Sequence, residues 1–329
     1  MLLAAVAVVP AARIGVEMPV AGDDGARGLA AVTAIRLALE PERLVVRDSA
    51  NGGFLNPHRD EGSDNDVDRR IAPSIVAFFA GDPKVVAAIG GLRRNVGDAD
   101  AAVAEARGLP LIVLARWSRN GRNANAFCLC LSPPRLVALA RDIARQRLGP
   151  RLLLVLVGDA GMLPALWPHR FDGLSVVRVE ATALSAVAAR RRARGVDGVI
   201  VIADERPPTL WSGAAFRKGF DAEYLRRLGH RDFRVVPDGI ARGHVATLEQ
   251  LVPASASRSF AARFRATAGF QPNSETETAH AAAQILGAAG SDRAAVRRAL
   301  QHGRFETVIG SVTFDADGYR ATALLAAVP

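Results

Sequence analysis

Polar and charged side chains follow several apolar runs of the sequence, at the points where those runs end. The run "VVAAIGG" precedes two arginines and an asparagine, and "LPLIVLA" precedes Arg-Trp-Ser. Acidic residues follow "RLLLVLVG", "DGVIVIA" and "FRVVP". In open parallel sheets, ligands bind just outside the carboxyl ends of the strands. The candidates for contacts with a small ligand are therefore Arg93, Arg94 and Asn95; Arg116, Trp117 and Ser118; Asp159; Asp204 and Glu205; and Asp238.

Arg94 is the candidate for binding an anionic group. The Gly-Gly pair before it lacks the GxGxxG spacing and the GK[ST] ending of nucleotide-binding loops, so no dinucleotide fold is expected. A helix that begins near this point would offer backbone N–H groups to a carboxylate, and an arginine beside them would bind both carboxylate oxygens. The alternative is that Arg93 and Arg94 are surface residues of a first helical turn. We expect Asn95 and Ser118 to form hydrogen bonds with the ligand.

Three further residues are candidate ligand contacts. Trp117 lies in the polar stretch "ARWSRNGRN", where a core tryptophan would be out of pattern. We expect its ring to stack on an apolar or cationic ligand group, or else to cover a strand edge. Asp204 and Asp238 are candidates for binding an amine or a hydroxyl group. Their alternative roles are structural, because Asp204 could cap a helix and Asp238, in "PDG", could form a turn.

The sequence has none of the patterns that we would expect of a hydrolase or a metalloenzyme. It contains no GxSxG, no HExxH and no CxxC pair, and its six histidines are isolated. The acidic cluster between residues 60 and 68 does not have the spacing of an EF-hand calcium loop. We therefore expect no enzymatic activity, no bound metal and no cofactor.

The two cysteines, Cys128 and Cys130, lie two residues apart in "AFCLCLS", which is predicted to be a strand. Side chains at that spacing point to one face of a strand. Such neighbours rarely form a disulfide of good geometry. We expect two small buried thiols.

Composition excludes some partners and leaves the N-terminal segment open to two interpretations. The 329 residues include 42 Lys and Arg against 33 Asp and Glu, a net charge of +9. The arginines are scattered without interleaved aromatic residues, so no nucleic-acid partner is expected. No run of about twenty apolar residues is present that would span a membrane. Residues 1–12, "MLLAAVAVVPAA", resemble a secretory signal without its basic start. We interpret them as a signal-peptide remnant; the alternative is an unprocessed segment before the first strand.

Continuous Val/Ile/Leu runs alternate with amphipathic stretches along the chain, which is typical of parallel sheets covered on both faces. The runs are too many for one small sheet, so we predict an α/β fold of two doubly wound parallel-sheet lobes. The polar stretch 51–70, "NGGFLNPHRDEGSDNDVDRR", is predicted to be a surface loop. The predicted helices are Leu29 to Leu39, Ala72 to Ala80, Asp98 to Arg107, Pro134 to Arg147, Leu184 to Arg194, Ser259 to Ala268, Thr276 to Ala288 and Asp292 to His302.

The order of the segments resembles the type I periplasmic solute-binding proteins, in particular the leucine/isoleucine/valine-binding branch of ABC importers. The opening "RIGVEMPVAGDDGARGLAAVTAIRLAL" is similar to that family's first strand, loop and helix. The segments "LVVRDSANG", "DPKVVAAIGGLRRN", "ARGLPLIVLARWS", "NAFCLCLSPPRLVALARDIA" and "GPRLLLVLVGD" follow in the family's order. The final "AAVRRALQHGRFETVIGSVTFDADGY" is similar to the family's closing Gly-x-(Ile/Val)-x-Phe-Asp-x-x-Gly. The likeness runs from about Arg13 to the end.

This resemblance implies a Venus-flytrap architecture, in which three crossing strands join two lobes and hinge closure traps a ligand between them. The first lobe would comprise 13–131 with 245–309, and the second 132–244 with 310–329. The implied protein is a periplasmic monomer that binds a small polar solute, such as an amino acid or a related carboxylate or amide. It would deliver that solute to the permease subunits of an ABC importer in the inner membrane. The alternative is a sensory or partner-binding relative of the same fold, with no transported amino acid.

The resemblance also assigns roles to single positions. Asp238 in "PDG" matches the acid of the family's Pro-Glu-Gly, which meets the ammonium group of the ligand. Ser118 would stand for the hydroxyl of the family's second loop. The first loop differs, because Arg94 or Asn95 lies where the family has serine, and the family's glycine-tyrosine gate near Asp204 is missing. We therefore expect the ligand to differ from the family's α-amino acids.

Overall fold

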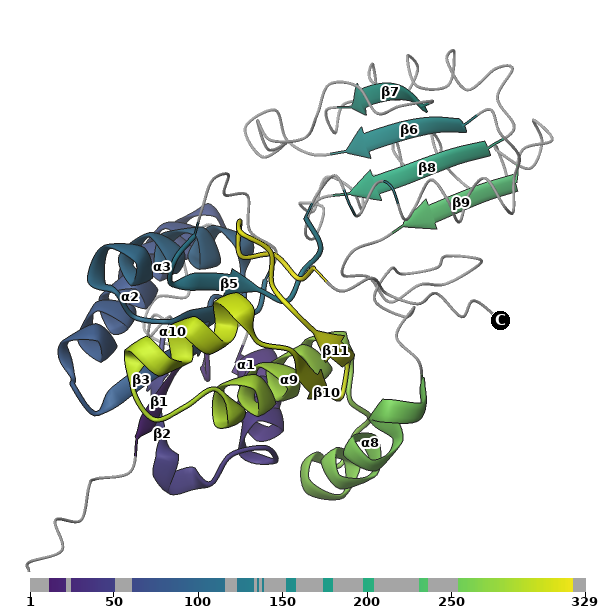
Figure 1. The fold of residues 1–329 in the computed structure, drawn as a ribbon. Helices are drawn as coiled ribbons and strands as arrows, with labels where there is room; N and C mark the ends of the chain where they lie inside the picture. The colour runs from purple at the N-terminus through teal and green to yellow at the C-terminus, as the bar shows by residue number, and fades with distance from the viewer. Residues whose placement is uncertain are drawn as a thin grey trace, which may run out of the picture. The chain divides into compact units, whose positions relative to one another are not determined.

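The computed structural model describes residues 12–21, 25–50, 61–115, 123–132, 135, 138, 152–157, 174–179, 198–203, 231–235 and 254–321. The chain divides into two compact units (Figure 1). Unit 1 comprises 1–131 with 253–324, and unit 2 comprises 132–252 with 325–329. The chain therefore passes between the units three times.

Unit 1 contains a parallel sheet of five strands in the order β2-β1-β3-β4-β5. The strands are β1 (Arg13–Met18), β2 (Leu44–Asp48), β3 (Val85–Gly90), β4 (Leu111–Val113) and β5 (Ala126–Cys128). The chain moves from β1 outward to β2 and then returns past β1 to β3. The direction of winding thus reverses between β1 and β3, the two strands at which this type of sheet leaves room for a ligand.

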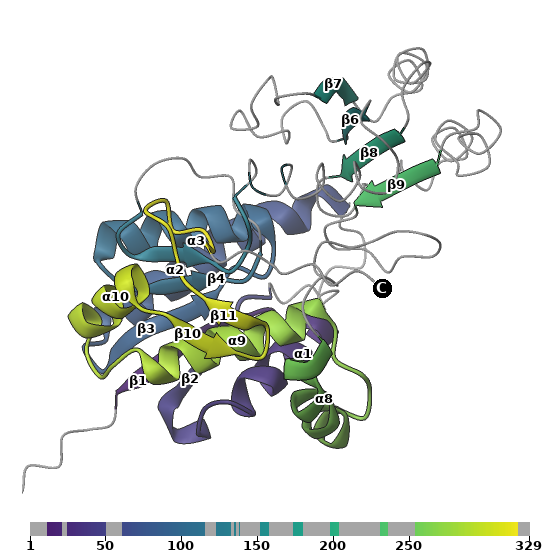
Figure 2. The same ribbon diagram turned by 45° about the vertical axis from the view of Figure 1, so that its right-hand side comes forward.

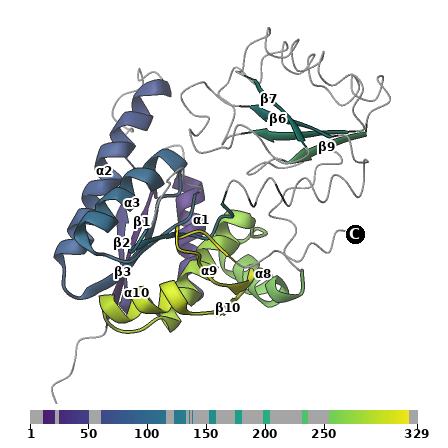
Figure 3. The same cartoon turned by 45° about the horizontal axis from the view of Figure 1, so that its top comes forward.

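Helices cover both faces of this sheet (Figure 3). Helix α2 (Glu61–Gly81) packs with α3 (Arg94–Arg107) on one face, and α1 (Gly25–Arg36) packs with α9 (Ser274–Ala288) on the other. The remaining elements are η1 (Pro41–Arg43), α8 (Ala254–Ala268) and α10 (Arg293–His302). Because both faces are covered, the central strand β3 is apolar along its whole length, and its six residues are buried.

The two faces of β1 hold different kinds of residue. Ile14, Val16 and Met18 are fully buried on one face. On the other face, Gly15 lies against the ring of Phe79 in α2, and Glu17 lies near α3. A Cβ atom on Gly15 would stand 2.5 Å from a ring carbon of Phe79. The missing side chain therefore allows α2 to approach the sheet.

The C-terminal part of unit 1 ends in a hairpin and a return to β5. Strands β10 (Phe305–Thr307) and β11 (Gly310–Val312) pair antiparallel. Tyr319 then pairs with Cys128, and the Arg320 N–H donates to the carbonyl oxygens of Cys128 and Cys130. These contacts place residues 310–321 in unit 1, whereas the sequence-based division assigned 310–329 to the second lobe. The boundary after residue 131 is the same in both divisions.

Unit 2 contains a second parallel sheet, with strand order β7-β6-β8-β9 (Figures 1 and 2). Its strands are β6 (Leu152–Val157), β7 (Leu174–Val179), β8 (Gly198–Ala203) and β9 (Arg231–Val235). The winding reverses between β6 and β8, as it does between β1 and β3 in unit 1. The predicted helix at 184–194 lies outside the described residues, and of the helix predicted at 134–147 only residues 135 and 138 are described, both of them helical.

Two local predictions are wrong. Residues 61–70, expected in a surface loop, form the first half of α2. Their acidic residues suit the N-terminal part of a helix, where the helix dipole favours negative charge. Cys128 and Cys130, expected as free thiols, are joined in a disulfide. Strand β5 ends at Cys128 and the chain bends after it, so the two Cα atoms come within 5.1 Å, which suits a disulfide.

Among the described residues, no helix is both long enough and apolar enough to cross a bilayer.

We predict that Gly15→Ala lowers the free energy of unfolding by about 1–3 kcal/mol, because the new methyl group displaces the buried Phe79 ring. Urea unfolding followed by far-UV circular dichroism measures this change. Gly81→Ala in α2 is the matched control, since nothing lies within 4 Å of the Cβ position there. The close-packing argument fails if both variants are as stable as the wild type.

Candidate functional site

The carboxyl ends of β1 and β3 form the candidate ligand-binding edge of unit 1. The reversal of winding between these two strands is the usual position of a ligand in an open α/β sheet. β1 ends at Met18, and β3 ends at Gly90, immediately before Gly91 and the turn into α3. The edge therefore brings together the start of the 19–21 segment and the 91–95 turn.

Backbone hydrogen bonds around Gly91 tie three strand ends together. The Gly91 N–H donates to Oε2 of Glu17 at 2.8 Å, on the end of β1. The Gly91 carbonyl accepts from the Ala115 N–H at 2.8 Å, and the Gly90 carbonyl accepts from the Leu114 N–H at 2.9 Å, just beyond β4. Gly91 has φ of +66°, a left-handed conformation that favours glycine. A change at Gly91 would consequently reach both neighbouring strand ends.

Two carboxyl groups lie buried under this turn. Glu17 is 1% exposed and Asp100 in α3 is 0% exposed. A Cβ atom on Gly90 would stand 2.8 Å from Oε2 of Glu17 and 3.5 Å from Oδ2 of Asp100, so both carboxyl groups face the same bare stretch of backbone. Glycine at position 90 leaves the space that the two carboxyl groups occupy.

Burial raises the pKa of the Asp100 carboxyl well above its usual range, and the charge and hydrogen bond of Glu17 raise it further. A carboxylate without a solvating cation is costly in an apolar interior, and two facing carboxyl groups ionise together only at a still higher cost. The Asp100 carboxyl accordingly retains its proton at a pH at which an exposed aspartate has lost its own.

The residues predicted from the sequence are placed only in part. Arg94 and Asn95 are the first two residues of α3, directly after the N-cap Arg93, so their backbone lies at the candidate edge. Trp117 and Ser118 follow β4, Asp204 follows the last residue of β8, and Asp238 follows β9 by three positions. These four residues lie outside the described ranges, and their roles remain predictions.

Sequence reasoning missed Glu17 and Asp100. Both carried a signal in the hydrophobic pattern: Glu17 is the acidic residue in the apolar run "IGVEM". Asp100 lies on the buried face of α3, four residues from the buried Val96 and Ala104. A charged side chain on the apolar face of an element requires a partner, and each of these residues supplies one for the other.

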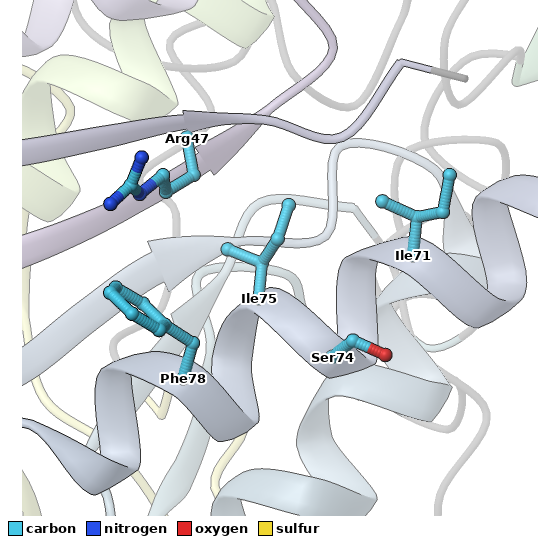
Figure 4. A pocket seen from close by; sticks show the side chains of 5 residues that line it. All are labelled: Arg47, Ile71, Ser74, Ile75 and Phe78. Atoms are coloured by element: carbon cyan, nitrogen blue, oxygen red, sulfur yellow. The ribbon is translucent and has the colours of Figure 1, made fainter. Parts of the chain in front are cut away.

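A second surface feature is an apolar depression between β2 and α2 (Figure 4), with a volume of about 460 Å³. Its lining residues are Arg47, Ile71, Ser74, Ile75 and Phe78. The Arg47 guanidinium lies 4.9 Å from the centre of the Phe78 ring, a cation–π contact. Few polar groups converge here, so the strand-end edge is the better candidate for a polar ligand.

The described residues contain no group of three or more His, Cys, Asp or Glu side chains that could hold a metal ion.

Comparison with solved structures relates this arrangement to known proteins. LivK, a leucine-binding protein from Thermotoga maritima, is 19% identical, covers 94% of this chain and 93% of its own, and has a TM-score of 0.65. An ABC transporter substrate-binding protein from Desulfitobacterium hafniense, solved with Leu, is 18% identical over 95% of both chains, with a TM-score of 0.64. A solute-binding protein from Rhodopseudomonas palustris, in complex with p-hydroxybenzoic acid, is 15% identical over 94% and 90%, with a TM-score of 0.61.

The chain has the fold of the type I periplasmic binding proteins. The sequence-based prediction of the fold class is thus confirmed. No model of a protein family matches the sequence, and no curated protein is similar to it at a significant level. The winding reverses between β1 and β3 in unit 1 and between β6 and β8 in unit 2. The carboxyl ends of these strands are the positions at which this type of sheet binds a ligand.

We predict that Asp100→Asn stabilises the protein at pH 8. A raised pKa in the folded state means that wild-type stability is fully present below the unfolded-state pKa and is lost as the pH rises through the folded-state pKa. Asparagine keeps a donor toward Glu17 and cannot ionise. The melting temperature should rise at pH 8 by about 2–4 °C for each kcal/mol recovered.

The advantage of Asp100→Asn should shrink toward pH 4 in calorimetric scans across this range. Asp98→Asn, on the same helix, is the matched control and should leave the pH profile unchanged. An Asp100→Asn profile parallel to that of the wild type at every pH would contradict the raised pKa.

Proposed function

We propose that this protein is the substrate-binding component of an ABC importer and captures a small polar solute. The observation that carries the proposal is the pair of parallel sheets with a reversal of winding in each, in a fold whose solved relatives include substrate-binding proteins of ABC transporters. The polar residues that the sequence places at the strand ends are binding groups, and no catalytic arrangement occurs among the described residues. Binding without chemistry is the function that this arrangement supports best.

The proposed ligand is an amino acid or a related carboxylate or amide. Structures of the same fold were solved with Leu, isoleucine and p-hydroxybenzoic acid, all of which carry a carboxylate. In our proposal, Arg94 binds an anionic group and Asn95 and Ser118 form hydrogen bonds. Trp117 stacks on the ligand, and Asp204 and Asp238 bind an amine or a hydroxyl group. Pre-placed polar groups of this kind determine affinity because they lose little freedom on binding.

The proposed partner is the permease of the importer, and the proposed location is the periplasm. The disulfide between Cys128 and Cys130 supports an oxidising compartment, since disulfides are rare in the cytosol of most organisms. We propose that the protein acts as a monomer, with closure of the two units as the step that traps the solute.

A thermal-shift screen of the purified protein tests this function. A ligand that binds the folded state raises the unfolding free energy by about 2.7 kcal/mol at a hundred times its dissociation constant. We expect a shift with at least one member of a panel of amino acids, dicarboxylates, amides and aromatic acids. Nucleotides and metal salts are the controls. A flat response across the whole panel would count against solute binding.

We predict that Arg94→Ala weakens the binding of an anionic ligand from that screen by about tenfold or more. Hydrogen bonds to charged groups contribute about 1.5–3 kcal/mol, and each 1.4 kcal/mol is a factor of ten. Isothermal titration calorimetry gives the dissociation constant. Arg107→Ala, at the exposed far end of the same helix, is the control. Unchanged affinity in Arg94→Ala would remove this residue from the site.

A further inference from the structure

The core of unit 1 contains an acidic pair that solute binding does not explain. Glu17 and Asp100 are both buried, at positions where the strand and helix patterns call for apolar side chains. Buried carboxyl groups of this kind destabilise a fold unless they are paired or hydrogen-bonded. A purely structural core would be served better by aliphatic residues. The pair therefore calls for another role, and its position under the 91–95 turn suggests one.

The Glu17 carboxylate accepts a hydrogen bond from a backbone N–H group at the candidate edge. The Gly91 N–H points from the strand end, where a ligand carboxylate could have met it, to Oε2 of Glu17. The chain's own carboxylate thus takes this hydrogen bond. Gly91 also accepts, at its carbonyl oxygen, a hydrogen bond from the Ala115 N–H. Ala115 precedes the predicted contacts Trp117 and Ser118 in the sequence. One acidic side chain therefore supports the start of both predicted ligand loops of unit 1.

Asp100 acts on this arrangement through Glu17. Apart from Glu17, neither oxygen of the Asp100 carboxyl has a hydrogen-bond partner among the described residues. Two carboxyl groups that face each other in a buried site share one proton, because the doubly charged form is strongly disfavoured. Loss of that proton to solvent would leave two carboxylates that repel each other beneath Gly91.

The elements around the pair differ in the charged groups that they carry. Within the described residues, β3, β4 and residues 71–81 of α2 carry no titratable side chain. On β2, Arg47 is the register partner of Glu17, and its guanidinium lies over the Phe78 ring of α2. On α3, Asp98 is half-buried two residues before Asp100, and Arg93 precedes the helix. The charge that raises the pKa of Asp100 is that of the Glu17 carboxyl.

We propose that Glu17 and Asp100 are a positioning pair, which shares one proton and, through the Gly91 amide, holds the strand ends that carry the predicted ligand loops of unit 1. While the proton is present, the 91–95 turn and the segment after β4 keep one geometry. When the proton leaves, repulsion displaces the Glu17 carboxylate and both strand ends loosen together. If the proposed function is correct, ligand affinity falls over the same pH range, and an anionic ligand group must be held by side chains instead of the Gly91 N–H.

The test is a pH titration of the Gly91 amide by NMR. The sequence contains two Gly-Gly pairs, at 52–53 and 90–91. Protein labelled with ¹³C-carbonyl glycine and ¹⁵N-glycine therefore gives two peaks in a carbonyl-selected amide spectrum, and Gly53→Ala shows which peak is Gly91. We expect the Gly91 peak to move in one step, with a midpoint well above the value of about 3.9 for an ordinary aspartate.

Variants separate positioning from ordinary packing. Asp100→Asn and Glu17→Gln each keep hydrogen-bonding groups in place and leave one carboxyl group without its like-charged neighbour, so each should move the midpoint of the step to lower pH, whereas Asp98→Asn should keep it. Hydrogen–deuterium exchange of the peptide that ends at Ala115, corrected for the intrinsic pH dependence, should accelerate above the same midpoint in the wild type. In Asp100→Asn it should not. Circular dichroism confirms that each variant is folded at every pH.

The proposal is overturned if the wild-type step has the midpoint of an exposed carboxylate, or if Asp100→Asn and Glu17→Gln both leave that midpoint unchanged. It is also overturned if the Ala115 peptide shows no acceleration while Gly91 titrates. None of these measurements uses a ligand. Failure of the positioning pair is thus distinguishable from failure of solute binding, which would leave the titration of Gly91 in place.

Discussion

Strand β1 lies between β2 and β3 and is covered by helices on both sides, and this constraint governs the rest of unit 1. A strand in this position must carry apolar side chains or glycine on each face. On one face it holds large aliphatic side chains, and on the other Gly15 allows α2 to approach. Glu17 is the exception, and Gly90, Gly91 and Asp100 accommodate it. The strand that organises the sheet thus also brings a charged group to the edge at which a ligand is expected.

Much of the fold was predictable because its signals are local and repeated. Runs such as "VVAAIGG" and "LPLIVLA" became β3 and β4, and the helical stretches at 98–107 and 276–288 lie within α3 and α9. The errors arose where local patterns compete with tertiary contacts. The acidic stretch 61–70 was interpreted by its polarity, although it is continuous with residues 71–81 of α2, which pack on the sheet. The cysteines were treated as part of one straight strand, although β5 ends at Cys128.

The candidate site was predictable only as a set of strand ends. The rule that ligands bind beyond the carboxyl ends of strands indicated the 91–95 turn correctly as an edge of the sheet. It could not show that Glu17 already binds the Gly91 N–H, because this hydrogen bond joins residues 74 positions apart. For a polar ligand, the consequence is chemical: the strand end presents an internal negative charge and one backbone donor fewer than the sequence suggested.

The division of unit 1 into two stretches of chain bears on the order in which its core can be completed. Residues 1–131 supply all five strands of the sheet, but α9, which covers the face beside α1, follows only after the whole of 132–252. Until the chain beyond residue 252 is available, one apolar face of the sheet lacks its second helix. Unit 1 therefore cannot bury its core before the whole sequence of the intervening part of unit 2 is present.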